Sequence, residues 1–215
     1  MATKSLDTYV SLSDVFLTHW AQVNTALAPR AVTLKGSYTI ANLKTDRDAY
    51  AAQLTVITNA DNDVQAARAQ RTTRQKALKE RLRQFRNAIL AQLGGTEFAA
   101  QLPVIPTSAA APSHWSKAFD DMASIWQKLE TTPPAGFDSP LTLADGYTRA
   151  QFVPDLAALK ATYTAEIAAE GQAKVLRQTR TTQARALRTR LVAYRKAIVG
   201  AFATGHPLLE SLPGL

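Results

Sequence analysis

The chain has 215 residues, no cysteine and a formal net charge of +8, from 25 Lys and Arg against 17 Asp and Glu. The lack of cysteine excludes disulfides, zinc–thiolate sites and thiol catalysis. No stretch approaches the roughly 18 consecutive apolar residues of a membrane span, and the start MATKSLDTYV lacks the basic and then apolar blocks of a secretory signal. We therefore expect a cytoplasmic protein without a membrane partner.

The first predicted element is a helix over residues 5–28, because its apolar residues recur at alternating steps of three and four. The residues of this stripe are Leu6, Tyr9, Ser13, Phe16, Trp20, Val23 and Leu27. The following segment VTLKGSYT, residues 32–39, predicts an ordered, largely extended loop. We expect Tyr38 to pack against the start of the next helix.

A long helix is predicted next, with Thr45 as its N-cap and Asp48 three residues later. A heptad pattern of seam residues runs from Tyr50 to Ile89 without a change of phase. The turn-forming residues TNADND at 58–63 favour a break, but the unbroken heptad phase favours one continuous helix of about 48 residues. Gly94 and Gly95 predict its end.

The same order of elements then recurs after the segment VIPTSAAAPS, residues 104–113, which we interpret as a linker. A second apolar stripe predicts a helix that Pro133 and Pro134 end. Its residues are Trp115, Phe119, Met122, Trp126 and Leu129. LTLADGYT at 141–148 matches the earlier loop, and Pro154 with Asp155 marks the start of a second long helix, whose seam reaches Ile198. Gly205 and Pro207 predict its end.

These recurrences are a tandem duplication at an offset of 109 residues. Ten of nineteen positions are identical between residues 71–89 and residues 180–198. The duplication predicts an all-α fold: two helical hairpins that form an elongated antiparallel four-helix bundle or coiled coil with an internal pseudo-twofold axis. Repeat 1 spans residues 1–103 and repeat 2 spans residues 114–215, and we expect both to share one core.

Charged residues interrupt the middle of both heptad seams, where an unpaired buried charge costs several kcal/mol. Antiparallel packing about an axis near residues 66 and 175 brings Asp61 opposite Arg180 and Arg71 opposite Glu170. We therefore predict a structural charge belt of these four residues, which sets the helix register. The alternative is that Arg68, Arg71, Arg177 and Arg180 gather as an anion-binding cluster.

Each repeat also carries one strongly basic segment. Residues 68–86 hold eight Lys and Arg against one Glu, and residues 174–196 hold eight against none. These side chains are candidates for anion binding or for a solvated helix face. They are Arg68, Arg71, Arg74, Lys76, Lys79, Arg81, Arg83 and Arg86 in repeat 1, and Lys174, Arg177, Arg180, Arg185, Arg188, Arg190, Arg195 and Lys196 in repeat 2.

Catalytic motifs are not evident in the sequence. His19, His114 and His206 stand alone, no Glu-x-x-His step for a di-iron bundle occurs, and no nucleophile elbow or phosphate-binding glycine loop is present. We expect no cofactor and no metal. The sequence favours a non-catalytic helical scaffold or protein-interaction module, acting on a protein partner or by self-association. The alternatives are sequence-independent binding of nucleic acid or another polyanion by the two basic segments, and an enzyme with an unrecognised site.

Overall fold

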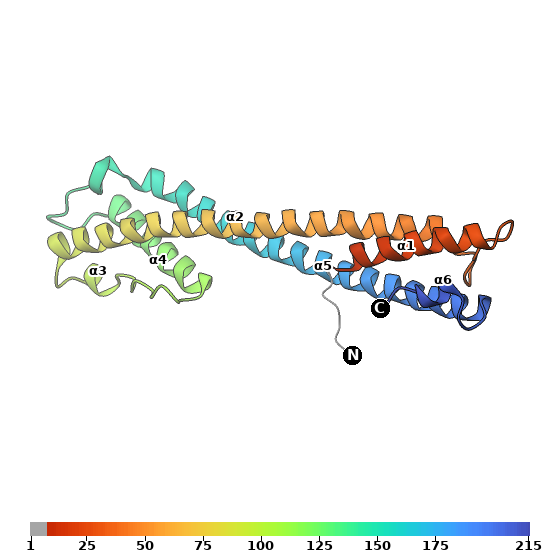
Figure 1. Cartoon of the computed structure of the whole chain (residues 1–215). Coiled ribbons are helices and arrows are strands. Elements are labelled where there is room, and N and C mark those ends of the chain that lie inside the picture. Colours follow the sequence, from red (N-terminus) through yellow and green to blue (C-terminus); the bar gives the residue numbers. More distant parts are fainter. Residues whose placement is uncertain (1–7) are drawn as a thin grey trace. The chain divides into compact units, whose positions relative to one another are not determined.

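The computed structural model describes residues 8–215 and is all-α, with no sheet in that part of the chain (Figure 1). Two long helices, α2 (Ile40–Leu93) and α5 (Arg149–Ala201), are antiparallel and pack together with shorter helices. The shorter elements are α1 (Tyr9–Ala26), α3 (Glu97–Ala100), α4 (Pro112–Thr131), the 3₁₀ helix η2 (Ala144–Gly146) and α6 (Pro207–Glu210).

The chain divides into two compact units, and each unit takes segments from both repeats. Unit 1 comprises residues 1–62 and 171–215, and unit 2 comprises residues 63–170. Unit 1 therefore contains α1, α6, the first part of α2 and the last part of α5. Unit 2 contains α3, α4, the rest of α2 and the first part of α5.

The core of unit 1 forms around the apolar face of α1. The stripe residues from Tyr9 to Val23 are buried there, with Phe16 and Trp20 fully enclosed, whereas Leu27 caps the helix and is half-buried. The ring of Trp20 stacks on Tyr194 of α5 at 4.5 Å, and Phe16 meets the same ring edge-on at 5.9 Å. The helix α1 ends at Ala26, two residues before the predicted end, and residues 5–7 of the predicted helix, Leu6 among them, lie outside the described residues.

The core of unit 2 forms in the same way around α4, whose predicted stripe is entirely buried. Trp126 lies 5.4 Å from Phe85 of α2 and 5.9 Å from Phe152 of α5, measured between ring centroids. Burial of large aromatic side chains contributes much of the hydrophobic stabilisation of a small unit, about 25 cal/mol per Å² of apolar surface. Both short amphipathic helices thus pack on the two long ones, as the stripes predict.

Both long helices begin earlier than expected, because a capping arrangement sets their start. Thr39 donates through its backbone N–H and its hydroxyl to Oδ1 of Asn42, at 2.8 and 2.9 Å. Thr148 bonds Oε1 of Gln151 in the same way, at 2.9 Å from the backbone N–H. These residues bond as in a capping box, in which the third residue after the cap accepts from the cap. The predicted starts at Thr45 and Pro154 are therefore wrong, and Pro154 lies inside α5.

The long helices are continuous, as the heptad phase predicts. Residues 58–63 remain helical, and the hydroxyl of Thr58 donates to the backbone oxygen of Leu54 within the helix, at 3.1 Å. Gly171 is also helical. The predicted end of α2 is confirmed: the helix stops at Leu93, and Gly95 follows with a φ of +83°, which strains any residue with a Cβ. The helix α5 ends at Ala201, four residues before the predicted stop at Gly205.

Candidate functional site

The candidate charge belt consists of ion pairs whose partners differ from those expected. In unit 1, Asp61 pairs with Arg177 rather than Arg180, and Arg180 forms no ion pair within residues 8–215. The partner thus lies about one helical turn away. A heptad pattern repeats every two turns and also allows neighbouring registers, so the packing of each core decides which charges meet.

In unit 2 the carboxylates that pair with arginines of the charged seam are those of Glu166 and Glu170. Glu166 is buried and accepts a hydrogen bond from Arg71 at 3.2 Å, while Nε of Arg68 lies 3.4 Å away. Glu170 pairs with Arg68 rather than Arg71, and this hydrogen bond is the main cause that raises the pKa of the Arg68 guanidinium. Arg71 is therefore the partner of Glu166, a residue that the predicted charge belt does not include.

These pairs bear directly on the alternative anion-binding cluster. Arg68, Arg71 and Arg177 each hold a carboxylate of their own unit. Such arginines would have to give up an existing partner in order to bind a ligand, and the exchange leaves a carboxylate unpaired. Only Arg180 of the four is unpaired within the described residues, and its Nε is buried without a hydrogen-bond acceptor.

A second constellation, which occurs once in each unit, ties the predicted tyrosine loops to both long helices. In unit 1, Tyr38 donates to Asp46 of α2 at 2.6 Å, and the guanidinium of Arg190 of α5 lies 4.4 Å from the centre of its ring. Burial and the nearby carboxylate raise the pKa of Tyr38 above its ordinary range. The expected packing of Tyr38 against the next helix is confirmed.

Unit 2 repeats this constellation with the roles of the two repeats exchanged. Tyr147 donates to Asp155 of α5 at 2.7 Å, and Arg81 of α2 lies 4.3 Å from its ring centre. Arg81 also donates to the backbone oxygen of Ala144, at 3.1 Å. Every polar group here has a structural partner, and cation–π contacts of this kind stabilise by about 0.5–2 kcal/mol. We call each of these arrangements a clasp: Tyr38, Asp46 and Arg190 in unit 1, and Tyr147, Asp155 and Arg81 in unit 2. Each clasp holds its loop against both long helices and leaves no reactive group free.

Several other candidate cations also have structural contacts. Arg86 and Arg195 donate to the backbone oxygens of Pro103 and Pro213, respectively. Arg83 pairs with Glu80, and Lys79 lies over the ring of Trp115. The remaining candidates have no ion pair, hydrogen bond or ring contact within residues 8–215. They are Arg74 and Lys76 in the first basic segment, and Lys174, Arg185, Arg188 and Lys196 in the second, besides Arg180.

The net charge is divided very unequally between the units. Unit 1 contains 13 Lys and Arg against six Asp and Glu, which gives +7, whereas unit 2 contains 12 against 11, which gives +1. The two basic segments have nearly equal charge in the sequence. Their surroundings differ, because most acidic residues belong to unit 2. Electrostatic attraction of an anionic partner is therefore concentrated on unit 1.

One buried polar pair was missed by the sequence reasoning. His19 of α1 lies 2.7 Å from the hydroxyl of Tyr194 through Nδ1 and 2.8 Å from the backbone oxygen of Leu208 through Nε2. Since a carbonyl oxygen only accepts, Nε2 carries a proton, and in the neutral imidazole Nδ1 then accepts from the hydroxyl of Tyr194. The signal available was a difference between the repeats, since the matching residues in unit 2 are Ile125 and Phe85.

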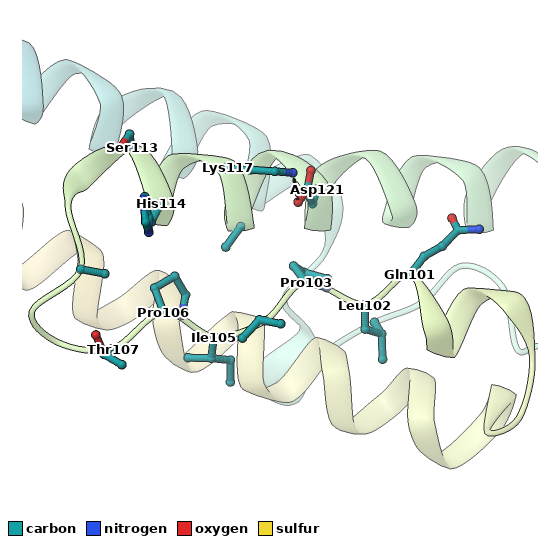
Figure 2. Close-up of a pocket in the computed structure, with 13 residues that line it drawn as sticks. Gln101, Leu102, Pro103, Ile105, Pro106, Thr107, Ser113, His114, Lys117 and Asp121 are labelled. Carbon is teal, nitrogen blue, oxygen red and sulfur yellow. Dashed lines mark hydrogen bonds and ion pairs between the residues drawn. The ribbon is translucent and has the colours of Figure 1, made fainter.

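An open groove of about 770 Å³ lies in unit 2, between α4 and the loop before it (Figure 2). The loop contributes apolar residues such as Pro103, Ile105 and Pro106, and α4 contributes His114 together with the ion pair between Lys117 and Asp121. Because Asp121 is held by Lys117 at 2.7 Å, it is not poised as a base for His114. The groove offers an apolar surface without a convergent set of catalytic groups.

Residues 8–215 contain no group of three or more His, Asp or Glu side chains placed to hold a metal ion. None of the helices in this part of the chain combines the length and apolar character required to cross a bilayer. Comparison with protein-family models, with curated proteins and with solved structures gives no match.

Proposed function

We propose that the protein is a non-catalytic helical interaction module. The supporting observation is that three of its four buried polar side chains are held by structural contacts. Within residues 8–215 the buried polar side chains are Ser13, His19, Thr162 and Glu166. Of these, His19 and Thr162 are hydrogen-bonded to helical residues and Glu166 bridges two arginines, whereas the hydroxyl of Ser13, on the buried face of α1, has no hydrogen-bond partner in that part of the chain. A catalytic site instead needs a polar group that is left free to reach a substrate.

The proposal includes the finer arrangement expected from the duplication: an elongated four-helix bundle of two hairpins, related by a pseudo-twofold axis. The matched clasps around Tyr38 and Tyr147 support it, since each repeat contributes the tyrosine to one clasp and the arginine to the other. Small-angle scattering of the purified chain tests this arrangement. A scattering profile of a compact sphere contradicts it, and a profile of a rod agrees with it.

The interaction role is tested by finding and reconstituting a partner. The tagged chain is incubated with extract of its native cell after nuclease treatment and in about 300 mM salt, which removes contacts that depend on nucleic acid or on screened charge. A retained protein is then purified and titrated against the chain. Saturable binding at fixed stoichiometry agrees with the proposal, as does a concentration-dependent dimer in sedimentation analysis. A monomeric chain that retains nothing contradicts it.

A second candidate function is polyanion binding, which the +7 charge of unit 1 favours. Cations without a carboxylate partner attract phosphates without first breaking an existing pair. Retention on heparin tests it, and we expect elution to require well above physiological salt. A chain that elutes with weakly basic proteins would rule out this function and leave the interaction module untouched.

A further inference from the structure

Four exposed cations form a row along one face of α5 in unit 1. They are Lys174, Arg185, Arg188 and Lys196. The three residues Lys174, Arg185 and Lys196 are each 11 residues apart, and 11 steps of about 100° return to within about 20° of the same direction. Arg188 lies one turn beyond Arg185 at the edge of this face. None of the four has an ion pair, a hydrogen bond or a ring contact within residues 8–215.

The surroundings of this row leave its positive charge uncompensated. The segment 174–196 contains no Asp or Glu. In unit 1 the carboxylates of Asp14, Asp46, Asp48 and Asp61 are all bonded to residues outside the row, and within residues 8–215 Glu210 forms no ion pair with any of the four cations. Binding of an anion to this row costs little free energy, since no existing salt bridge has to be broken.

The row is particular to repeat 2, so the duplication does not explain it. The corresponding residues of repeat 1 are Gln65, Lys76, Lys79 and Asn87, of which two are neutral. Lys79 in addition lies over Trp115, and Glu80 is its neighbour in the chain. Helix packing is common to both repeats and does not require the extra cations on α5.

The length of the row fits a polyanion with a regular repeat. At 1.5 Å per residue, Lys174 and Lys196 lie about 33 Å apart along the helix, with Arg185 about 16.5 Å from each. A nucleic-acid duplex turns once in roughly 34 Å, so each phosphate backbone returns to the same face at about the separation of Lys174 and Lys196, and the second backbone crosses that face between them. We propose that this face of α5 docks along the phosphate backbones of a nucleic-acid duplex without reading its base sequence.

A duplex suits this face better than other polyanionic partners. Single-strand binders stack bases on exposed aromatic side chains. The only aromatic residue of segment 174–196 is Tyr194, which is buried in the core. A membrane-bound helix needs an apolar face for the lipid, and the apolar seam of α5 is occupied by α1 and α2. The inference rests on the second candidate function, polyanion binding, and narrows the binding residues from both basic segments to the row on α5.

The test compares two variants that lose the same charge. The row variant carries Lys174→Gln, Arg185→Gln, Arg188→Gln and Lys196→Gln. The control variant carries Arg74→Gln, Lys76→Gln, Arg83→Gln and Lys128→Gln, which are all exposed and belong to unit 2. Circular dichroism establishes that both are folded. Fluorescence anisotropy then measures binding to a labelled mixed-sequence DNA duplex of about three turns, to one of its single strands and to a poly-glutamate peptide.

We expect the full chain to prefer the duplex and to lose roughly 100-fold in affinity between 50 and 200 mM salt, as about four phosphate contacts require. The row variant should bind the duplex at least about tenfold more weakly and with a much shallower salt dependence, while the control changes less than about threefold.

Equal weakening of both variants overturns the proposal and attributes binding to net charge alone, with heparin retention still intact. Equal or tighter binding of the single strand, or of poly-glutamate through the same row, also overturns it. If the chain binds neither heparin nor duplex, the second candidate function fails as well.

Discussion

The buried pair of His19 and Tyr194 provides a sharp test of how polar groups stabilise unit 1. Tyr194 is fully buried and His19 is 4% exposed, so water cannot replace a lost partner at either side chain. Tyr194→Phe keeps the ring that stacks on Trp20 and removes only the hydroxyl. It leaves Nδ1 of His19 without a donor, and we expect the free energy of unfolding to fall by about 1–3 kcal/mol.

His19→Ile should cost a similar amount, because it leaves the hydroxyl of Tyr194 and the backbone oxygen of Leu208 without their hydrogen bonds. The double variant His19→Ile with Tyr194→Phe recreates the apolar pair that unit 2 already has in Ile125 and Phe85. Since it removes both polar partners together, its cost should be about 1–2 kcal/mol smaller than the sum of the single costs.

Urea unfolding, monitored by far-ultraviolet circular dichroism and tryptophan fluorescence, measures these differences in the free energy of unfolding. In thermal unfolding, each kcal/mol corresponds to a melting-temperature shift of about 2–4 °C in a chain of this size. The matched control is Phe85→Tyr in unit 2. It adds a hydroxyl to a ring that is fully buried in the apolar core of unit 2, where Ile125 takes the place of His19 in the repeat, and should destabilise by about 1–3 kcal/mol. The reasoning would be refuted if Tyr194→Phe lowered the free energy of unfolding by less than about 0.5 kcal/mol. It would also be refuted if the loss in the double variant equalled the sum of the losses in the two single variants.

Three further sets of measurements test other parts of the structure. Glu166→Gln removes the carboxylate between two partly exposed arginines, so we expect a loss of about 1–3 kcal/mol in urea, less than for a fully buried pair, and an unchanged midpoint would contradict this account. The pKa values of Tyr38 and Tyr147 are raised above the ordinary value of 10.0. The folded chain therefore keeps these protons longer than the unfolded chain, and stability should be full below pH 10 and decline as the pH rises further, less so in the double Tyr→Phe variant. Gly95→Ala at a positive φ should cost about 1–2 kcal/mol, whereas Gly171→Ala, in open space within α5, should stabilise by about 0.5–1 kcal/mol; the opposite order of melting temperatures would contradict these backbone assignments.

Most of the helical architecture follows from local sequence. The stripe of α4 and the seam of α2 are spacing patterns, and spacing alone decides which residues share a helix face. Gly95 marks a helix end because a positive φ favours glycine. The early start of α2 was also available locally, since Thr39 and Asn42 stand three residues apart as in a capping box. The predicted N-cap, Thr45, lies six residues after the observed one, Thr39.

The candidate site was predicted only as a set of charges. The sequence locates Asp61, Arg71 and Glu170 on the seam, but side chains on neighbouring turns compete for the same partner. Glu166 takes Arg71 because the unit 2 core fixes the two helices in one register. The buried bonds of His19 depend on Tyr194 and Leu208, which are more than 170 residues away in the sequence, and no local pattern predicts such a meeting.

The sequence by itself determined the duplication, the helices and the end of α2 at its glycines, because the helical patterns and this end depend on residues within a few turns of one another. Only the tertiary structure decided which charged side chains form ion pairs and how the net charge is divided between the two units. Of two basic segments with almost the same composition, 68–86 lies in a unit whose acidic residues balance it, and 174–196 lies in a unit with a net charge of +7. Lys174, Arg185, Arg188 and Lys196 remain unpaired there because electrostatic pairing depends on distance in space, which only the folded chain sets.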